Sequence, residues 1–185
     1  RLTPFRTKVR LLEEAGVDLL FALAFDSSMA SLTAEAFAER VLVAGLDLRH
    51  ASIGYNFAFG KGRTGDAATL LEFGLARGFG VTPVGPALSV NGKAYSSSRA
   101  RALIAGGEVA EAAQILGRPW EVEGRVETGQ RLGNTIGFPT ANLKLGEHVR
   151  PATGVYAVEC AIEDSTTWHG GAANFGRRQI GRAHV

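Results

Sequence analysis

The most informative ten residues of this chain are Gly133-Asn134-Thr135-Ile136-Gly137-Phe138-Pro139-Thr140-Ala141-Asn142. Two glycines, a proline and small hydrogen-bonding side chains make this stretch a poor helix former. Apolar residues alternate with other residues before it, at 120–126, and after it, at 155–162, which is the pattern of β-strands. The stretch is therefore predicted to be a polar loop between two strands, and it marks the end of the chain as β-structure.

Within this loop, Thr140 and Asn142 lie two positions apart, so their side chains point to the same side of an extended segment. A hydroxyl and an amide carbonyl are hard oxygen ligands, which suit a magnesium ion that carries nucleotide phosphates. A β-turn in which the same side chains bond their own backbone is the simpler interpretation on local chemistry alone. The residue types by themselves leave both interpretations open.

The same region resembles the riboflavin kinase signature. The resemblance rests on Gly-Phe-Pro-Thr-Ala-Asn at 137–142, on Gly-Gln-Arg-Leu-Gly at 129–133 and on Gly-Val-Tyr at 154–156. It implies that Thr140 and Asn142 hold Mg²⁺ together with ATP. The ATP-binding residues that it implies are Gly133, Gly137, Phe138, Pro139, Thr140 and Asn142.

Composition limits the classes of protein to consider. The chain has 185 residues, of which 45% are hydrophobic, enough for one large or two small domains. It has no run of ~18 apolar residues, and its first residues do not resemble a secretory signal. Cys160 is the only cysteine, which excludes an internal disulfide, and a net charge of +2 gives no argument for a nucleic-acid partner. We expect a cytoplasmic protein with small-molecule substrates and neither a nucleic-acid nor a membrane partner; its oligomeric state stays open.

Helix and strand patterns alternate in the first part of the chain. Helices are predicted at 4–15, 34–44, 66–77, 99–104 and 108–116, and strands at 17–25, 50–54 and 81–85, with a hairpin turn at Asn91-Gly92. This alternation predicts an α/β layer with a parallel sheet. Strand patterns alone follow Pro119, so the domain boundary is placed at 117–119.

A second glycine-rich loop, at 54–66, is predicted to lie between a strand and a helix, where α/β sheets bind ligands. Gly60, Gly62 and Gly65 match the spacing of the dinucleotide fingerprint, but no acidic residue follows about 20 positions later to bind a ribose. Lys61 is followed by glycine rather than by Ser or Thr, so the loop is not a Walker loop. A solvated surface loop is the alternative interpretation.

This loop is similar to that of the bacterial FMN adenylyltransferase domain, which is fused in front of riboflavin kinase in bifunctional FAD synthetases. The similarity rests on a spaced set of residues, which are Gly54, Asn56, Phe57, Phe59, Gly60, Arg63, Gly65 and Asp66. Many members of the family have Asp at the position of Asn56. Ser-Ser-Ser-Arg-Ala-Arg at 96–101 resembles a second motif of that domain, although simple helix capping would also explain the serines. The resemblance implies an ATP- and flavin-binding set made of Asn56, Phe57, Gly60, Arg63, Gly65, Asp66, Ser96, Ser97, Ser98 and Arg101.

Two family features do not appear in the sequence. The histidine-containing phosphate motif that opens the adenylyltransferase domain is not matched by His50, His148, His169 or His184. After Asn-Phe-Gly-Arg-Arg at 174–178, the expected Pro-Thr-Phe gives way to residues 179–185, which resemble translated adapter sequence, and the catalytic Glu of the kinase family is not found. We therefore expect a fragment truncated at both ends, without catalytic residues and inactive by itself.

Taken together, the resemblances imply an α/β Rossmann-like nucleotidyltransferase domain at 1–117, followed by an antiparallel β-barrel riboflavin kinase domain at 118–178. The parent would phosphorylate riboflavin to FMN and adenylylate FMN to FAD, with ATP and Mg²⁺. Two alternatives stay open: a non-catalytic nucleotide- or flavin-binding module, and an NAD(P)-binding Rossmann oxidoreductase that rests on Gly60, Gly62 and Gly65.

Overall fold

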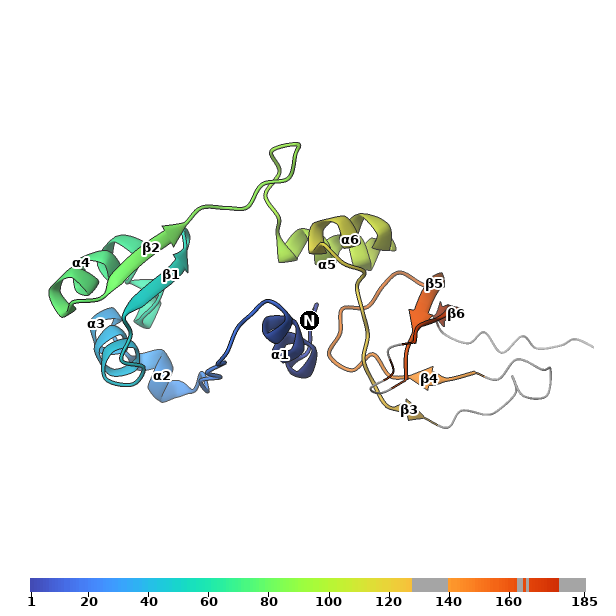
Figure 1. Ribbon diagram of the computed structural model, residues 1–185, viewed down its shortest axis with the longest axis horizontal. Coiled ribbons are helices and arrows are strands. Elements are labelled where there is room, and N and C mark those ends of the chain that lie inside the picture. The colour runs from blue at the N-terminus through green and yellow to red at the C-terminus, as the bar shows by residue number, and fades with distance from the viewer. Residues whose placement is uncertain (128–139, 163–164, 166, 177–185) are drawn as a thin grey trace, which may run out of the picture. The chain divides into compact units, whose positions relative to one another are not determined.

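The computed structural model describes residues 1–127, 140–162, 165 and 167–176 (Figure 1). The chain divides into two compact units, one formed by Leu19–Ala94 and the other by Arg1–Asp18 with Tyr95–Val185. Each unit is described by itself.

The unit Leu19–Ala94 is built on two parallel strands, β1 (His50–Gly54) and β2 (Gly80–Val84), which pair from His50 with Gly80 to Gly54 with Val84. The helix α4 (Ala67–Arg77) connects them, as a parallel pair requires. The short helices α2 (Ser27–Ser31) and α3 (Ala34–Phe37) precede β1, and α3 continues as the π-helical segment η1 (Ala38–Val43). The core of the unit consists of Ala38, Phe59, Leu70 and Phe79. The strands expected at 50–54 and 81–85 and the helix expected at 66–77 are thus confirmed.

Local signals explain where these helices begin and end. The Thr33 hydroxyl accepts a hydrogen bond from the Ala36 amide at 3.1 Å, and the Asp66 carboxylate accepts one from the Thr69 amide at 2.9 Å. Both side chains therefore cap helix N-termini. Helix α4 ends at Gly78, whose φ of 81° is readily available only to glycine.

The strand predicted at 17–25 is wrong. These residues have no regular structure, and large apolar side chains among them are exposed, with Phe21 at 62% and Phe25 at 84%. A β-strand requires a neighbouring strand for its backbone hydrogen bonds. In the part of the chain that the structure describes, β1 and β2 form a two-stranded sheet that does not include this segment.

The other unit contains α1 (Phe5–Glu14), α5 (Ser97–Gly106) and α6 (Val109–Leu116). Helices α5 and α6 pack together, and Ala100, Ile104 and Ala112 are fully buried. Its strands are β3 (Val126–Glu127), β4 (Asn142–Leu143), β5 (Gly154–Cys160) and β6 (His169–Phe175). No helix among the described residues combines the length and the apolarity needed to cross a membrane.

The strands of this unit form two separate antiparallel pairs, β3 with β4 and β5 with β6. Within the described residues 120–127, the strand expected at 120–126 is limited to Val126–Glu127, because only these two pair with β4. The described residues do not form the closed barrel expected for 118–178, since closure requires every strand to pair on both sides.

The cap of α4 makes the stability of its unit depend on pH. Hydrogen bonds from the Thr69 amide and the Thr69 hydroxyl lower the pKa of the Asp66 carboxyl. A lowered pKa stabilises the folded state above the unfolded pKa of about 4, and this contribution is lost as the pH falls through the lower, folded value. We expect Asp66→Asn, which still caps, to lose less stability than the wild type when thermal unfolding is followed from about pH 6 to pH 2. Asp66→Ala should be less stable than both near neutral pH. Identical pH profiles for the wild type and Asp66→Asn would contradict this role.

Candidate functional site

The glycine loop at 54–66 begins at the carboxyl end of β1, where parallel sheets bind ligands. The Tyr55 amide donates to the Val84 carbonyl at 2.8 Å, which extends the pairing of β1 with β2 by one bond. Phe59 and Gly65 then exchange two backbone hydrogen bonds of 2.9 Å each. Residues 60–64 are therefore closed into a small arch that includes the 3₁₀ turn Lys61–Arg63.

The base of this arch lies against the start of α3. The Lys61 amide donates to the Leu32 carbonyl at 2.6 Å. A Cβ on Gly60 would come within 2.5 Å of the Ala34 amide nitrogen, and one on Gly65 within 2.7 Å of the Phe59 ring. Two of the predicted site glycines are thus required by close packing.

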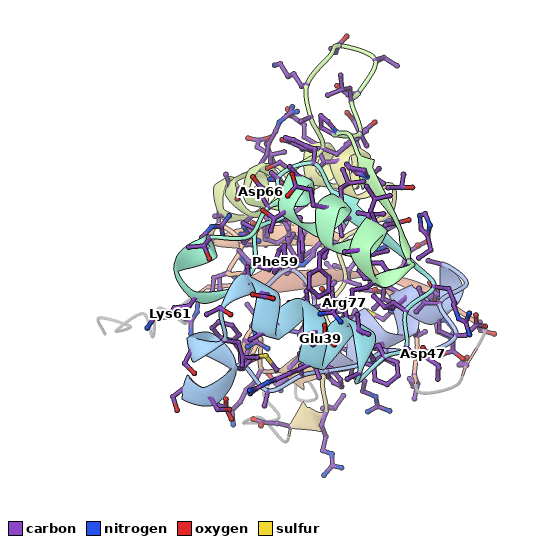
Figure 2. The ribbon with its side chains drawn as sticks, turned by 90° about the vertical axis from the view of Figure 1, so that its left-hand side faces the viewer. Glu39, Asp47, Phe59, Lys61, Asp66 and Arg77 are labelled. Atoms are coloured by element: carbon purple, nitrogen blue, oxygen red, sulfur yellow. The ribbon has the colours of Figure 1, made fainter. Side chains whose placement is uncertain are left out.

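The two phenylalanines of the loop, Phe57 and Phe59, point into the protein, whereas Tyr55 is exposed. Phe59 is buried, and its ring lies 5.3 Å from that of Phe57 and 5.7 Å from that of Phe37. Figure 2 shows Phe59 among the surrounding elements and Lys61 at the outer edge. Phe57 packs against the same core cluster, so its structural role is to anchor the loop.

The polar residues of the loop point the other way. Asn56, Lys61, Arg63 and Asp66 are exposed. Arg63 has a φ of 59°, a left-handed conformation that is unfavourable for a residue other than glycine. Neither Lys61 nor Arg63 takes part in an ion pair within the described ranges, so both cations can face a phosphate. The loop has the charge of an anion site, built on a rigid base.

A second group of predicted site residues lies at the start of α5. Ser96 caps the helix by accepting from the Arg99 amide at 3.2 Å, and the Arg101 guanidinium donates to the Ser98 hydroxyl at 3.0 Å. Ser97, Ser98 and Arg101 are exposed, while Ala100 and Ile104 anchor the helix from its buried side. Hydroxyls, a guanidinium and the positive end of the helix dipole together favour an anion. This group belongs to the unit that does not contain the glycine loop.

Of the residues predicted to bind magnesium-ATP in the kinase region, the structure describes Thr140 and Asn142. Asn142 begins β4, where it pairs with Glu127, and Thr140 precedes the strand; both side chains are exposed. Neutral side-chain oxygens of this kind fit a magnesium ion bound to phosphates. Gly133, Gly137, Phe138 and Pro139 lie outside the described residues.

One arrangement was not predicted from the sequence. Strands β5 and β6 place Gly154 beside Phe175 and Val155 beside Asn174. Two short motifs, Gly-Val-Tyr at 154–156 and Asn-Phe-Gly at 174–176, are therefore neighbours in one hairpin. The sequence indicates that both motifs occur in strand-like patterns. It does not indicate which residues of the two strands lie opposite one another, and the structure shows this.

Comparison with known proteins identifies two consecutive family regions. The FAD synthetase family matches residues 1–99, and the riboflavin kinase family matches residues 116–184. The bifunctional riboflavin kinase/FMN adenylyltransferase of Escherichia coli (strain K12) is 42% identical over 159 residues, which are 86% of this chain and 50% of that protein. The protein of the same name from Haemophilus influenzae is 36% identical over 178 residues, which are 96% of this chain and 57% of that protein.

A solved structure is also similar. It is titled as a macrolide-efflux protein from Streptococcus pneumoniae, with a TM-score of 0.81 and 32% identity, and the match covers 95% of this chain and 55% of that chain. The chain thus spans about half the length of the curated relatives it matches.

The packing of the glycine loop can be tested with two glycines of similar backbone conformation. Gly60 has a φ of 74° and Gly62 a φ of 65°, but a Cβ on Gly62 would meet nothing within 4 Å. We expect Gly62→Ala to lower the free energy of unfolding by about 1 kcal/mol, the cost of the left-handed backbone. Gly60→Ala should cost about 2–4 kcal/mol, because it adds a clash with the backbone of Ala34. Urea unfolding measures both values, and equal losses would mean that the loop does not depend on this contact.

Proposed function

Since this chain belongs to the family of bifunctional riboflavin kinase/FMN adenylyltransferases, we propose that the protein containing it makes flavin cofactors in two steps. In the first step, the γ-phosphoryl group of ATP is transferred to the 5′-hydroxyl of riboflavin, which gives FMN and ADP. In the second, the FMN phosphate attacks the α-phosphorus of another ATP, which gives FAD and pyrophosphate. The observation that carries this proposal is that the two family regions follow one another in this chain, at 1–99 and 116–184.

We assign the second step to the first region of the chain. The exposed cations of the glycine loop, Lys61 and Arg63, would bind phosphate oxygens, and Asn56 would add an amide. The start of α5 would bind a further phosphate through Ser98 and Arg101, which already contact each other. The remaining residues of this set have supporting roles: Phe57, Gly60 and Gly65 hold the loop, and Asp66 and Ser96 cap helices.

The kinase step is assigned to the second region. Thr140 and Asn142 would hold a magnesium ion through their side-chain oxygens, and Asn142 is positioned for this by the backbone of β4. When bound, the ion would neutralise charge on the phosphates of ATP. Gly133 and Gly137 would let the backbone approach the nucleotide closely, because glycine has no Cβ, and Phe138 and Pro139 would belong to the same loop.

The proposed domains follow the same division. Residues 1–117 would form a Rossmann-like nucleotidyltransferase domain and residues 118–178 a β-barrel riboflavin kinase domain. The parallel pair β1–β2 and the antiparallel pairs β3–β4 and β5–β6 support this assignment. Residues 179–185 are assigned to neither domain, although the riboflavin kinase match extends to 184. The family regions do not favour a nicotinamide-dependent oxidoreductase.

The first test separates the kinase step from the adenylyl transfer in a protein of the relatives' length that carries this sequence. We expect Thr140→Ala and Asn142→Ala to lower FMN formation from riboflavin and magnesium-ATP by at least 10–100-fold, on the order of what is seen for changes next to a bound metal. FAD formation from supplied FMN should stay within about twofold, because the second step is assigned to other residues. Lys144→Ala is the matched control, since Lys144 follows β4 and pairs with Glu127 at the surface. Loss of both activities in folded variants would refute the division into two sites.

The reciprocal test uses the start of α5. Arg101→Gln removes the guanidinium that contacts Ser98 but leaves the cap at Ser96 intact. We expect FAD formation to fall on the order of 100-fold, the cost of losing one charged group that stabilises a transferring phosphate. FMN formation should not change, and Arg99→Gln on the same helix is the control. An unchanged rate of FAD formation would remove Arg101 from the proposed site.

A further inference from the structure

Helix α1 lies in the FAD synthetase region of the sequence, yet it belongs to the compact unit that contains the riboflavin kinase region. Of the ten residues of α1, only Thr7 is buried. Phe5 is 56% exposed and Val9 is 37% exposed, and Leu11 and Leu12 are only partly buried, so apolar burial is an incomplete attachment for this helix. Polar contacts must therefore supply much of its attachment.

The main polar contact is a cluster of charges around Arg10. Its guanidinium lies 2.6 Å from a carboxylate oxygen of Glu121, 3.0 Å from one of Glu123 and 2.7 Å from one of Glu14. Arg118 adds a second cation, 3.2 Å from the same Glu121 oxygen. The Glu121 side chain is 26% exposed and that of Arg118 is 28% exposed, so solvent screens the contacts to Glu121 less than an ordinary surface pair. Arg10 itself is 42% exposed, and Glu14 is the most exposed member at 56%.

The chemistry of Arg10 fits this position. A planar guanidinium can donate to several carboxylates at once, which the ammonium group of lysine does less well. The hydrogen bonds to Glu14 and Glu123, together with Glu121, raise the pKa of Arg10 further above its ordinary value. Arg10 thus stays charged at any pH at which the protein is folded.

A second set of contacts joins the same segments independently of these charges. The Trp120 indole donates to the Leu2 carbonyl at 3.2 Å, and the Val149 amide donates to the Arg1 carbonyl at 2.7 Å. The Trp120 ring also meets the ring of His148 edge-on, at 6.3 Å between centroids. The residues that lead into α1 are therefore held by Trp120, which precedes Glu121 in the chain, and by Val149 of a later segment.

We propose that Arg10 fastens α1 to residues 118–123 and thereby joins the FAD synthetase region to the beginning of the riboflavin kinase region. The partner of this face of α1 is a segment of the same chain with two carboxylates, and the joint consists of Arg10 paired with Glu121 and Glu123. Glu14, on α1 itself, is a third carboxylate against the same guanidinium. Helix α1, from the FAD synthetase region, therefore packs in the same compact unit as the riboflavin kinase region. This joint does not depend on which ligands the two regions bind.

The test uses Trp120 as a reporter of the joint in the chain as it stands. Trp168→Phe leaves Trp120 as the only tryptophan, and its fluorescence quenching by acrylamide measures how well it is covered. We expect Arg10→Gln to raise the quenching constant by about twofold and to speed hydrogen exchange of the Val149 amide on the order of fivefold. In the protein without Arg10→Gln, about 1 M NaCl should also raise the quenching constant and speed this hydrogen exchange, because the Debye length falls to about 3 Å. Arg6→Gln is the matched control: it removes the same charge from the same helix, and Arg6 has no ion pair among the described residues.

A double-mutant cycle removes the remaining ambiguity. Among the described residues, Glu123 pairs with Arg10 and with no other cation. Glu123→Gln should raise the quenching constant of Trp120 less than Arg10→Gln does. The double variant with both substitutions should raise it by less than the sum of the two single effects. If Arg10→Gln fails to fold, which circular dichroism would show, Glu123→Gln and the salt series decide. The proposal is overturned if Arg10→Gln, or in its place Glu123→Gln, matches Arg6→Gln, or if the double variant shows the full sum.

Discussion

The unit Leu19–Ala94 depends on the burial of Phe59. This ring connects the glycine loop to the core that contains Ala38 and Leu70, and it stacks on Phe57. The same burial brings the loop so close to Ala34 that glycine is needed at 60 and 65. An apolar anchor on the inside thus allows cations to be presented on the outside, with Lys61 and Arg63 at the tip of a supported arch.

The proposed phosphate site at the start of α5 is also supported by buried apolar side chains, but by different ones. Helix α5 is held by Ala100 and Ile104 on its buried side, which leaves Ser98 and Arg101 exposed at its positive end. In both places the polar groups lie on an element that packing has made rigid. Phosphoryl transfer needs rigidly held polar groups more than it needs a protein nucleophile, because the reaction depends on positioning and on charge stabilisation.

The two family regions are less separate in the structure than in the sequence. Helix α1 contacts residues 118–123 through Arg10, although more than a hundred residues lie between them. Arg10 reaches both Glu121 and Glu123 because these residues lie two apart on an extended segment and so face the same side. Glu14 is a third carboxylate on the same guanidinium because it lies one helical turn after Arg10. A boundary drawn from sequence patterns alone would cut through this contact.

Local features of this chain were determined by its sequence. Thr33, Asp66 and Ser96 cap helices because an N-cap needs only a side-chain oxygen and an amide three residues later. The strands β1 and β2 and the glycine loop between β1 and α4 were also predictable, because their patterns and turn residues are contained in short segments. The types of the candidate site residues could be predicted for the same reason, and so could the family motifs that they form.

The tertiary structure decided what depends on distant partners. The apolar run at 17–25 has the composition of a strand but has no partner strand among the residues that the structure describes. Residues 34–44 form an α-helix that changes to a π-helix at Ala38, which local propensity does not indicate. The register that places Val155 beside Asn174, and the attachment of α1 to residues 118–123, arise from contacts between segments far apart in the chain. Such contacts depend on which surfaces remain free after each element has formed, and this is not encoded in any single stretch of sequence.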